Sequence, residues 1–187
     1  MKQVLIASAH PDDMEIGMGG TVAAMVATGC VITSIVMTDG RRSPNPFGWS
    51  EGETARIRKE ECSIAASALG VSEVVYFDLP DLKTEGNYLS AKQGLKELIG
   101  QIQPAEVYTL HERLDRHSAH RLAGRLTIES VREANVPSLN SLWAYEAWGP
   151  FSSWDRIEYI DEHIGEKVLA IAQHRSQLAS IHMARGL

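Results

Sequence analysis

The sequence predicts one α/β domain with a Rossmann-like, mostly parallel sheet and helices on both faces. Strand-like apolar runs alternate with helical stretches along the chain, an order that is typical of right-handed βαβ units. No internal repeat, low-complexity tract or linker divides the 187 residues. We therefore expect residues 1–187 to form a single domain with one core.

The first two strands and the helix between them are expected within residues 1–38. An apolar run over residues 4–9 is typical of a buried strand. Residues 16–38 carry no charge and are long enough to span a bilayer, but glycines at positions 17, 19, 20 and 29 divide them. We therefore expect a helix over 21–28 and a β-branched strand over 31–38, and no membrane span.

The remaining elements continue the alternation. One helix ends before Gly70 and the next ends before Pro104, since both residue types terminate helices. A long C-terminal helix begins at Asp161, which is a good capping residue. In chain order we expect a helix over 53–69, a strand over 73–77, a helix over 90–103, a strand over 107–110, a helix over 118–135, a strand over 142–148 and a helix over 161–181.

Composition and charge limit the kinds of binding partner and the cellular compartment that we expect for this protein. The net charge of -6 and the lack of a basic cluster argue against nucleic acid as a partner. The first apolar run is short and has no cleavage-site pattern, so no secretory signal is expected. Cys30 and Cys62 lie in apolar patterns without metal-type spacing. We expect reduced core cysteines in a cytoplasmic protein.

His10, Asp12 and Asp13 directly follow the first predicted strand. In an open α/β sheet, ligands bind outside the carboxyl ends of the strands. Imidazole and carboxylate groups suit a divalent transition metal, and a carboxylate that stays off the metal can take a proton from bound water. This stretch therefore predicts a metal hydrolase.

Other polar residues are expected at the same edge of the sheet. His117 and His120 lie three positions apart at a helix start, so both can face the same way. Polar residues also end the later strands: Asp39, Arg41 and Arg42 after the second, Asp78 and Asp81 after the third, and His111 and Glu112 after the fourth. We expect these groups to converge on one pocket.

The candidate substrate contacts are Asp39, Arg58, Asp81 and His111, and three of them have a second interpretation. Arg58 suits a substrate hydroxyl or anion, or a structural ion pair with Glu60 or Glu61. Asp81 suits substrate hydroxyls, or an Asx turn after a proline. His111 suits a metal or a substrate, or a hydrogen bond to the backbone.

Residues 9–20, Ala-His-Pro-Asp-Asp-Met-Glu-Ile-Gly-Met-Gly-Gly, resemble the opening signature of the LmbE-like or PIG-L-like zinc-dependent N-deacetylases. Weaker similarities follow in the family's order, at Thr38-Asp39-Gly40, at Arg58 with Glu61, at Leu69-Gly70-Val71 and at His174-Arg175-Ser176-Gln177. The resemblance covers nearly the whole chain. It implies a zinc-dependent hydrolase that acts on an amide.

The resemblance also implies roles for the site residues. His10, Asp13 and His120 would hold zinc, or another divalent transition metal such as Fe2+, while Asp12 acts as general base. His117 would polarise the amide carbonyl or the leaving nitrogen. The family commonly has an acidic residue directly before the third ligand, where this chain has Ala119. Such an acid would steady the preceding histidine, and Asp115 is close enough in sequence to His117 to take its place.

The implied substrate is a small N-acetylglucosamine-type sugar or its conjugate. The sequence is compatible with a homo-oligomer but does not predict the number of subunits. The alternative reaction is cleavage of a larger amide on a thiol-sugar conjugate. The alternative class is a metal- or carbohydrate-binding module without turnover. A nucleotide-dependent oxidoreductase is disfavoured, because residues 17–20 lack the GxGxxG spacing and the carboxylates before them would repel a pyrophosphate.

Overall fold

The computed structural model describes the backbone of residues 1–184 and the side chains of residues 1–180. Its centre is a five-stranded sheet in the order β3-β2-β1-β4-β5, in which every neighbouring pair is parallel. The strands are β1 (Gln3–Ser8), β2 (Val31–Thr38), β3 (Glu73–Leu79), β4 (Glu106–Leu110) and β5 (Ser141–Tyr145). The predicted α/β class and the parallel sheet are confirmed.

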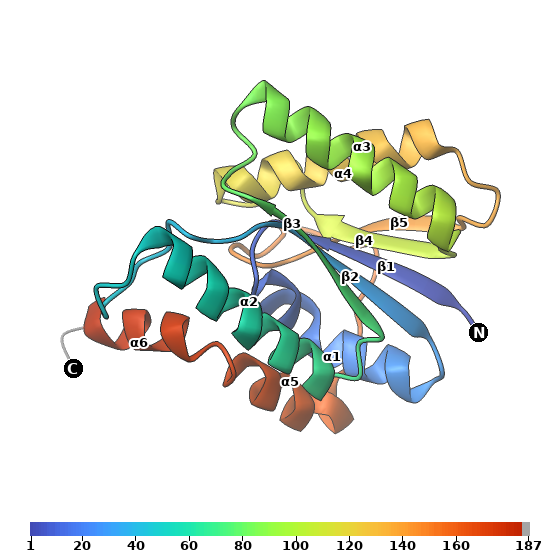
Figure 1. The fold of residues 1–187 in the computed structure, drawn as a ribbon. Coiled ribbons are helices and arrows are strands. Elements are labelled where there is room, and N and C mark those ends of the chain that lie inside the picture. Colours follow the sequence, from blue (N-terminus) through green and yellow to red (C-terminus); the bar gives the residue numbers. More distant parts are fainter. Residues whose placement is uncertain (185–187) are drawn as a thin grey trace.

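Helices cover both faces of the sheet, as predicted (Figure 1). One face carries α3 (Glu85–Ile102) and α4 (Ser118–Ala134). The other carries α1 (Asp13–Ala27), α2 (Glu51–Ala68), α5 (Ile164–Ile171) and α6 (Arg175–Ala184). The central strand β1 is buried from Val4 to Ser8. Among the described helices, none has the length and apolar character needed to cross a membrane.

The prediction that glycines delay the first helix until residue 21 is wrong. Helix α1 begins at Asp13 and contains three glycines. A Cβ on Gly17 would lie 2.5 Å from the carbonyl oxygen of Glu146, and one on Gly20 would lie 2.6 Å from the side chain of Ile160. These glycines therefore allow the segment after β5 to pack closely on α1, which outweighs their low helix propensity.

This packing predicts opposite effects for two Gly→Ala substitutions in helices. Gly17→Ala should lower the free energy of unfolding by about 1–3 kcal/mol, because the methyl group would collide with backbone. Gly100→Ala is the matched control, since a Cβ there meets no atom within 4 Å. It should raise that free energy by up to about 1 kcal/mol. Urea denaturation of both variants measures the difference, and an unchanged Gly17→Ala variant would contradict the packing argument.

The prediction of one long C-terminal helix is also wrong. A 3-10 turn at Asp161–His163 leads into α5. The helix is interrupted after Ile171, and α6 begins at Arg175. His174 at the break is buried, with Nε2 3.6 Å from Oε2 of Glu15. The Glu61 carboxylate accepts hydrogen bonds from the backbone N–H of Ser176 at 2.9 Å and from its hydroxyl at 2.6 Å. Glu61 thus satisfies a free N–H at the start of α6, which makes the second helix stable.

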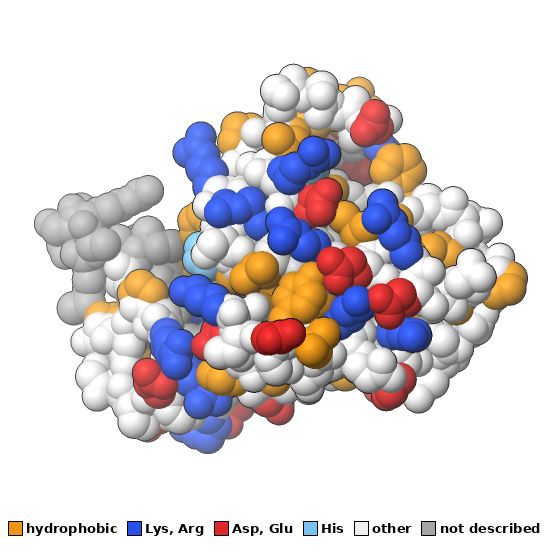
Figure 2. Space-filling model, turned by 90° about the horizontal axis from the view of Figure 1, so that it is seen from above, with side chains coloured by type: hydrophobic (Ala, Val, Ile, Leu, Met, Phe, Trp, Pro, Cys, Tyr) orange, Lys and Arg blue, Asp and Glu red, His pale blue; other side chains and the backbone are white. Residues whose placement is uncertain are grey.

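Figure 2 shows the face of the molecule that points upward in Figure 1. On this face, basic and acidic side chains are interspersed around hydrophobic ones. Intermixed charges give a weak net field over such a surface. This face therefore lacks the continuous basic stripe that attracts a phosphate backbone.

Candidate active site

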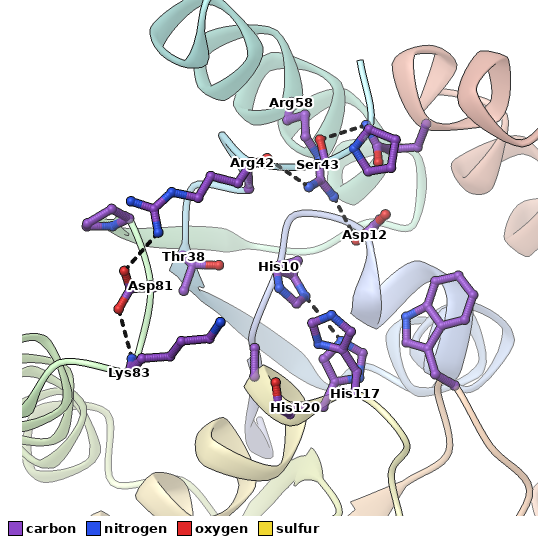
Figure 3. A pocket seen from close by; sticks show the side chains of 17 residues that line it. His10, Asp12, Thr38, Arg42, Ser43, Arg58, Asp81, Lys83, His117 and His120 are labelled. Atoms are coloured by element: carbon purple, nitrogen blue, oxygen red, sulfur yellow. Dashed lines mark hydrogen bonds and ion pairs between the residues drawn. The ribbon is translucent and has the colours of Figure 1, made fainter. Parts of the chain in front are cut away.

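A cavity of about 390 Å³ opens at the carboxyl ends of the strands (Figure 3). It lies where the strand order reverses, because β1 pairs with β2 on one side and with β4 on the other. Its size is in the range of small-molecule pockets. The predicted site residues that line it are His10, Asp12, Arg58, Asp81, His117 and His120.

His10, Asp13 and His120 bring three potential metal ligands together. His10 Nδ1 lies 3.1 Å from His120 Nε2, and His120 Nε2 lies 3.1 Å from Asp13 Oδ1. The backbone N–H groups of Ala9 and His10 donate to the other carboxylate oxygen, Asp13 Oδ2, at 3.0 and 2.8 Å. Asp13 Oδ1 is buried and accepts no hydrogen bond from the described residues. Oδ2 is thus anchored by the backbone and lies 3.5 Å from His10 Nδ1, while Oδ1 is left to face the ring of His120.

Asp115 contacts the His120 ring at Nδ1, the nitrogen that does not face Asp13. Its Oδ2 lies 3.1 Å from His120 Nδ1, and both side chains are buried. Asp115 does not take the place of the missing acid beside the His117 ring, because Asp115 Oδ1 accepts a hydrogen bond only from the His117 backbone N–H, at 2.8 Å. A carboxylate on Nδ1 keeps Nε2 free to bind a metal and makes the ring more basic. Asp115 therefore serves His120.

The charges of these groups favour a cation between them. Burial by itself would raise the pKa of Asp13, yet His10 and then His120 hold that pKa well below its usual range. Burial by itself would lower the pKa of His120, but the negatively charged carboxylates of Asp13, 3.1 Å from Nε2, and of Asp115, 3.1 Å from Nδ1, raise it to about 9. Positive charge is thus stabilised at the point where the three side chains meet.

Asp12 lies beside this cluster and is held by Arg58. Arg58 Nη2 lies 3.0 Å from Asp12 Oδ1, and Arg58 Nη1 donates to the carbonyl oxygen of Gly40 at 3.3 Å. A Cβ on Gly40 would lie 2.1 Å from that guanidinium nitrogen, and Gly40 also has φ +67. Glycine is therefore required at this position, both for the turn after β2 and for the approach of Arg58.

The alternative ion pair between Arg58 and a glutamate of its own helix does not form. Glu60 accepts from Arg56 at 2.7 Å, and Glu61 caps α6 through Ser176. Arg58 is buried, so its pairing with Asp12 is shielded from solvent. The structure places Arg58 against the predicted base as well as at the pocket wall.

His117 precedes α4 and faces the pocket with the other two histidines. The centroid of its ring lies 5.0 Å from that of His10 and 4.7 Å from that of His120. Partial burial lowers its pKa, and positive charge on His10 and His120 lowers it further. Among residues 1–180, no carboxylate hydrogen-bonds the His117 ring. A neutral His117 ring can donate one N–H into the pocket.

Asp39 and His111, two predicted substrate contacts, do not line the cavity. Asp39 Oδ2 accepts from Arg41 Nε at 2.7 Å, and its Oδ1 accepts from the Arg41 backbone N–H at 3.0 Å. His111 Nδ1 accepts from the backbone N–H groups of Arg113 and Leu114 at 3.1 and 3.2 Å. Both residues therefore stabilise turns after their strands.

Asp81 forms an Asx turn, the second of the two interpretations that its sequence position allowed. Its Oδ1 accepts from the backbone N–H of Lys83 at 2.8 Å, and its Oδ2 lies 3.2 Å from Arg42 Nη1. The turn and Arg42 together keep the pKa of Asp81 below its usual value. The turn also brings Lys83 into the pocket wall, which the sequence analysis did not predict. The only sequence signal for Lys83 is its place two residues after Asp81.

The donor set of the cluster fits a divalent transition metal. Ligand atoms bound tetrahedrally at 2.0–2.1 Å lie roughly 3.3 Å apart, close to the separations found for His10, Asp13 and His120. A set of His10, His117 and His120 is the alternative, since one nitrogen from each lies within 4.8 Å of the others. We favour the set with Asp13, because His120 Nε2 lies 3.1 Å from both His10 Nδ1 and Asp13 Oδ1, and because this set uses the buried oxygen that lacks a hydrogen bond.

Residues 5–131, which hold every one of these side chains, match the PIG-L family, described as GlcNAc-PI de-N-acetylase. The chain belongs to the PIG-L family. The resemblance of residues 9–20 to its opening signature is thereby confirmed.

Individual relatives agree with the PIG-L assignment. The diacetylchitobiose deacetylase of Thermococcus kodakarensis is 33% identical over 143 residues, which are 75% of this chain and 53% of that protein. The chain therefore spans about half the length of this relative. The structure of N,N'-diacetylchitobiose deacetylase from Pyrococcus horikoshii with an inhibitor has a TM-score of 0.80 and 29% identity, over 94% of this chain and 70% of that chain.

The same fold also supports a different reaction. The 4-carboxy-2-hydroxymuconate hydratase of Pseudomonas putida has a TM-score of 0.80 at 21% identity, over 96% of this chain and 81% of that chain. At this identity the similarity concerns the fold alone. The reaction of this PIG-L member must therefore be argued from its site.

Proposed function

We propose that this PIG-L family member is a metal-dependent N-deacetylase, with residues 1–187 forming one catalytic domain. Its reaction would be hydrolysis of the acetamide of an N-acetylglucosamine-type sugar to acetate and a free amine. The observation that carries this proposal is the cluster of His10 and His120 at the pocket wall with the buried Asp13 against them, and Asp12 held beside the cluster by Arg58. The family description and the deacetylase names of two relatives support the substrate class.

His10, Asp13 and His120 would hold the metal, and two nitrogens with one carboxylate oxygen suit zinc with one position left open. When bound, a divalent metal supplies a Lewis acid that polarises the amide carbonyl and lowers the pKa of a water. Asp115 would fix the ring of His120 during metal binding, as carboxylates behind metal-binding histidines do.

Asp12 would act as the general base and then as the general acid. Its carboxylate accepts a proton from the attacking water and returns it to the leaving nitrogen, which departs as an amine. Arg58 fixes one oxygen, Asp12 Oδ1, through the 3.0 Å ion pair. The other oxygen, Asp12 Oδ2, is then available to the water. Arg58 is a positioning residue in this proposal.

His117 would stabilise the oxyanion that forms on the amide carbonyl. The centroid of its ring lies 5.0 Å from that of His10, and among the described residues no carboxylate hydrogen-bonds the His117 ring. A hydrogen-bond donor at such a position contributes on the order of 3 kcal/mol to catalysis. The His117 ring is one candidate for that donor.

The proposal is tested by acetate release from N-acetylglucosamine and from diacetylchitobiose. We expect zinc-loaded protein to release one acetate per new amine, and chelation of the metal to stop the reaction. Acetate is measured enzymatically and the amine by a fluorogenic label. Protein that binds zinc fully but releases no acetate from either sugar would contradict the proposal and favour a binding module.

Substitution of Arg58 tests its contact with Asp12. Arg58→Met keeps an unbranched apolar stem but removes the guanidinium group and its ion pair, so kcat should fall by on the order of 10- to 100-fold through misplacement of the base. KM should change much less. Steady-state kinetics measure the split, and thermal unfolding of the same sample controls for loss of fold. A raised KM with unchanged kcat would instead assign Arg58 to substrate binding.

A further inference from the structure

Trp148 lies in the cavity wall and has no part in the proposed chemistry. It belongs to the loop that follows β5, and 52% of its surface is exposed. Its neighbour Ala147 packs against the core, whereas Trp148 lines the cavity. Among residues 1–180, it is the only Phe, Tyr or Trp in that wall. The cavity therefore offers one aromatic surface to a ligand.

The backbone of Trp148 is tied to the candidate metal ligands. Its N–H donates a hydrogen bond to Asp115 Oδ2 at 3.4 Å, and the same oxygen lies 3.1 Å from His120 Nδ1. Asp115 is buried, so both contacts are shielded from solvent. One carboxylate oxygen thus sets the position of Trp148 relative to His120.

Contacts within the loop restrict its movement further. Glu146 Oε1 accepts hydrogen bonds from the backbone N–H of Phe151 and from Trp154 Nε1, the latter at 3.1 Å. The ring of Phe151 packs edge-on against that of His111, with centroids 5.2 Å apart. A wall that is already ordered loses little conformational entropy when a ligand binds. The loop therefore presents Trp148 in a position suited to binding.

We propose that Trp148 is the platform against which the pyranose ring of the N-acetyl sugar lies during deacetylation. This inference rests on the proposed function and assigns a residue that positions the sugar. A pyranose carries its hydroxyl groups around the edge of the ring, and its two faces consist largely of C–H groups. Contact between such a face and the electron-rich face of an indole removes apolar surface from water on both sides.

The other walls of the cavity complement this placement. A pocket with one aromatic surface and several polar groups is typical of small-molecule sites, because the polar groups fix the orientation of the ligand. The acetamide at the metal cluster and the ring on Trp148 would hold the sugar at two points, which orients the carbonyl for attack. The charged and hydrogen-bonding side chains left for the hydroxyl groups are those of Thr38, Arg42, Ser43, Asp81, Lys83 and Gln177.

The activity test compares N-acetylglucosamine with its open-chain alditol, N-acetylglucosaminitol. Both compounds carry the same acetamide and a chain of hydroxyl groups, but the alditol has no ring face to lie on an indole. We expect the wild type to favour the closed sugar by on the order of 10-fold in kcat/KM. Acetate release measures both substrates.

Trp148→Ala should remove most of this preference, chiefly by raising KM for the closed sugar, because the platform binds ground and transition states alike. Trp148→Phe should keep part of it, since phenylalanine retains an aromatic face. Trp154→Phe is the matched control, because Trp154 is 59% exposed in the same loop but does not line the cavity. Its preference should equal that of the wild type.

Two results of the activity test would overturn the proposal. One is a preference for the closed sugar that survives in Trp148→Ala. The other is an equal loss of kcat/KM for sugar and alditol, which would assign Trp148 to the fold or to a contact between subunits. Thermal unfolding and gel filtration of the same samples identify which of these structural roles applies.

A binding measurement separates this inference from the proposed reaction. Tryptophan fluorescence of the zinc-loaded protein is titrated with glucosamine and with glucosaminitol, neither of which can be deacetylated. We expect glucosamine to give a saturable change in the wild type and in Trp154→Phe, but not in Trp148→Phe. This result would support the platform even if no acetamide were cleaved. A change that persists in Trp148→Phe, or its absence from the wild type, would overturn the proposal.

Discussion

Asp12→Asn should lower kcat by on the order of 100-fold or more without loss of metal. An amide cannot accept the proton of the attacking water, but its oxygen can still accept a hydrogen bond from Arg58, so the local fold is kept. Acetate release measures kcat, elemental analysis measures the metal, and thermal unfolding measures stability. Asp78→Asn is the control, because Asp78 is an exposed residue paired with Lys59 on the surface.

The same variants test which of two adjacent carboxylates is the base. Asp13 Oδ1 faces His120, whereas Asp12 pairs with Arg58. If Asp12→Asn lost the metal and Asp13→Asn kept it, the two roles assigned here would be exchanged. Full activity of Asp12→Asn would remove general-base catalysis by this residue from the proposal.

The second large effect is loss of metal when two ligands are removed together. Wild-type protein should bind one divalent metal per chain, and the double variant His10→Ala, His120→Ala should bind almost none, because a single carboxylate remains. Inductively coupled plasma analysis after gel filtration measures the content. His111→Ala should keep full occupancy, since His111 stabilises a turn outside the cavity.

Two further single variants decide between the possible ligand sets. Asp13→Ala should lose the metal and His117→Ala should keep it while losing most of kcat. The reverse result would favour the set of three histidines, whose nitrogens also lie within reach of one another. Full metal in the double variant His10→Ala, His120→Ala would contradict both sets.

The parallel sheet could be predicted because strand signals are local. The strand expected over 31–38 has the same bounds as β2, and the helix expected over 118–135 differs from α4 by one residue. Apolar runs, β-branched residues and helix-ending residues act within a few positions of each other. The errors lie in α1 and at the break before α6, where distant segments decide. Gly17 lies within α1 because the absence of a Cβ there leaves room for the backbone of Glu146. Helix α6 starts where the Glu61 carboxylate accepts a hydrogen bond from the backbone N–H of Ser176.

The candidate metal site could be predicted for a similar reason, since His10, Asp12 and Asp13 are neighbours in a turn and His117 and His120 are neighbours at a helix start. The partners of these residues could not. Asp115 serves His120 and not the ring of His117, and Arg58 pairs with Asp12 and not with a glutamate of its own helix.

The sequence by itself therefore determined the order of strands and helices, the chemistry of the ligands and their place at the ends of the strands. Only the tertiary structure decided which charges are paired. Asp12 and Asp81 are matched by Arg58 and Arg42. An ion pair depends on separations of a few ångströms between side chains from different elements, and spacing along the chain carries no record of them.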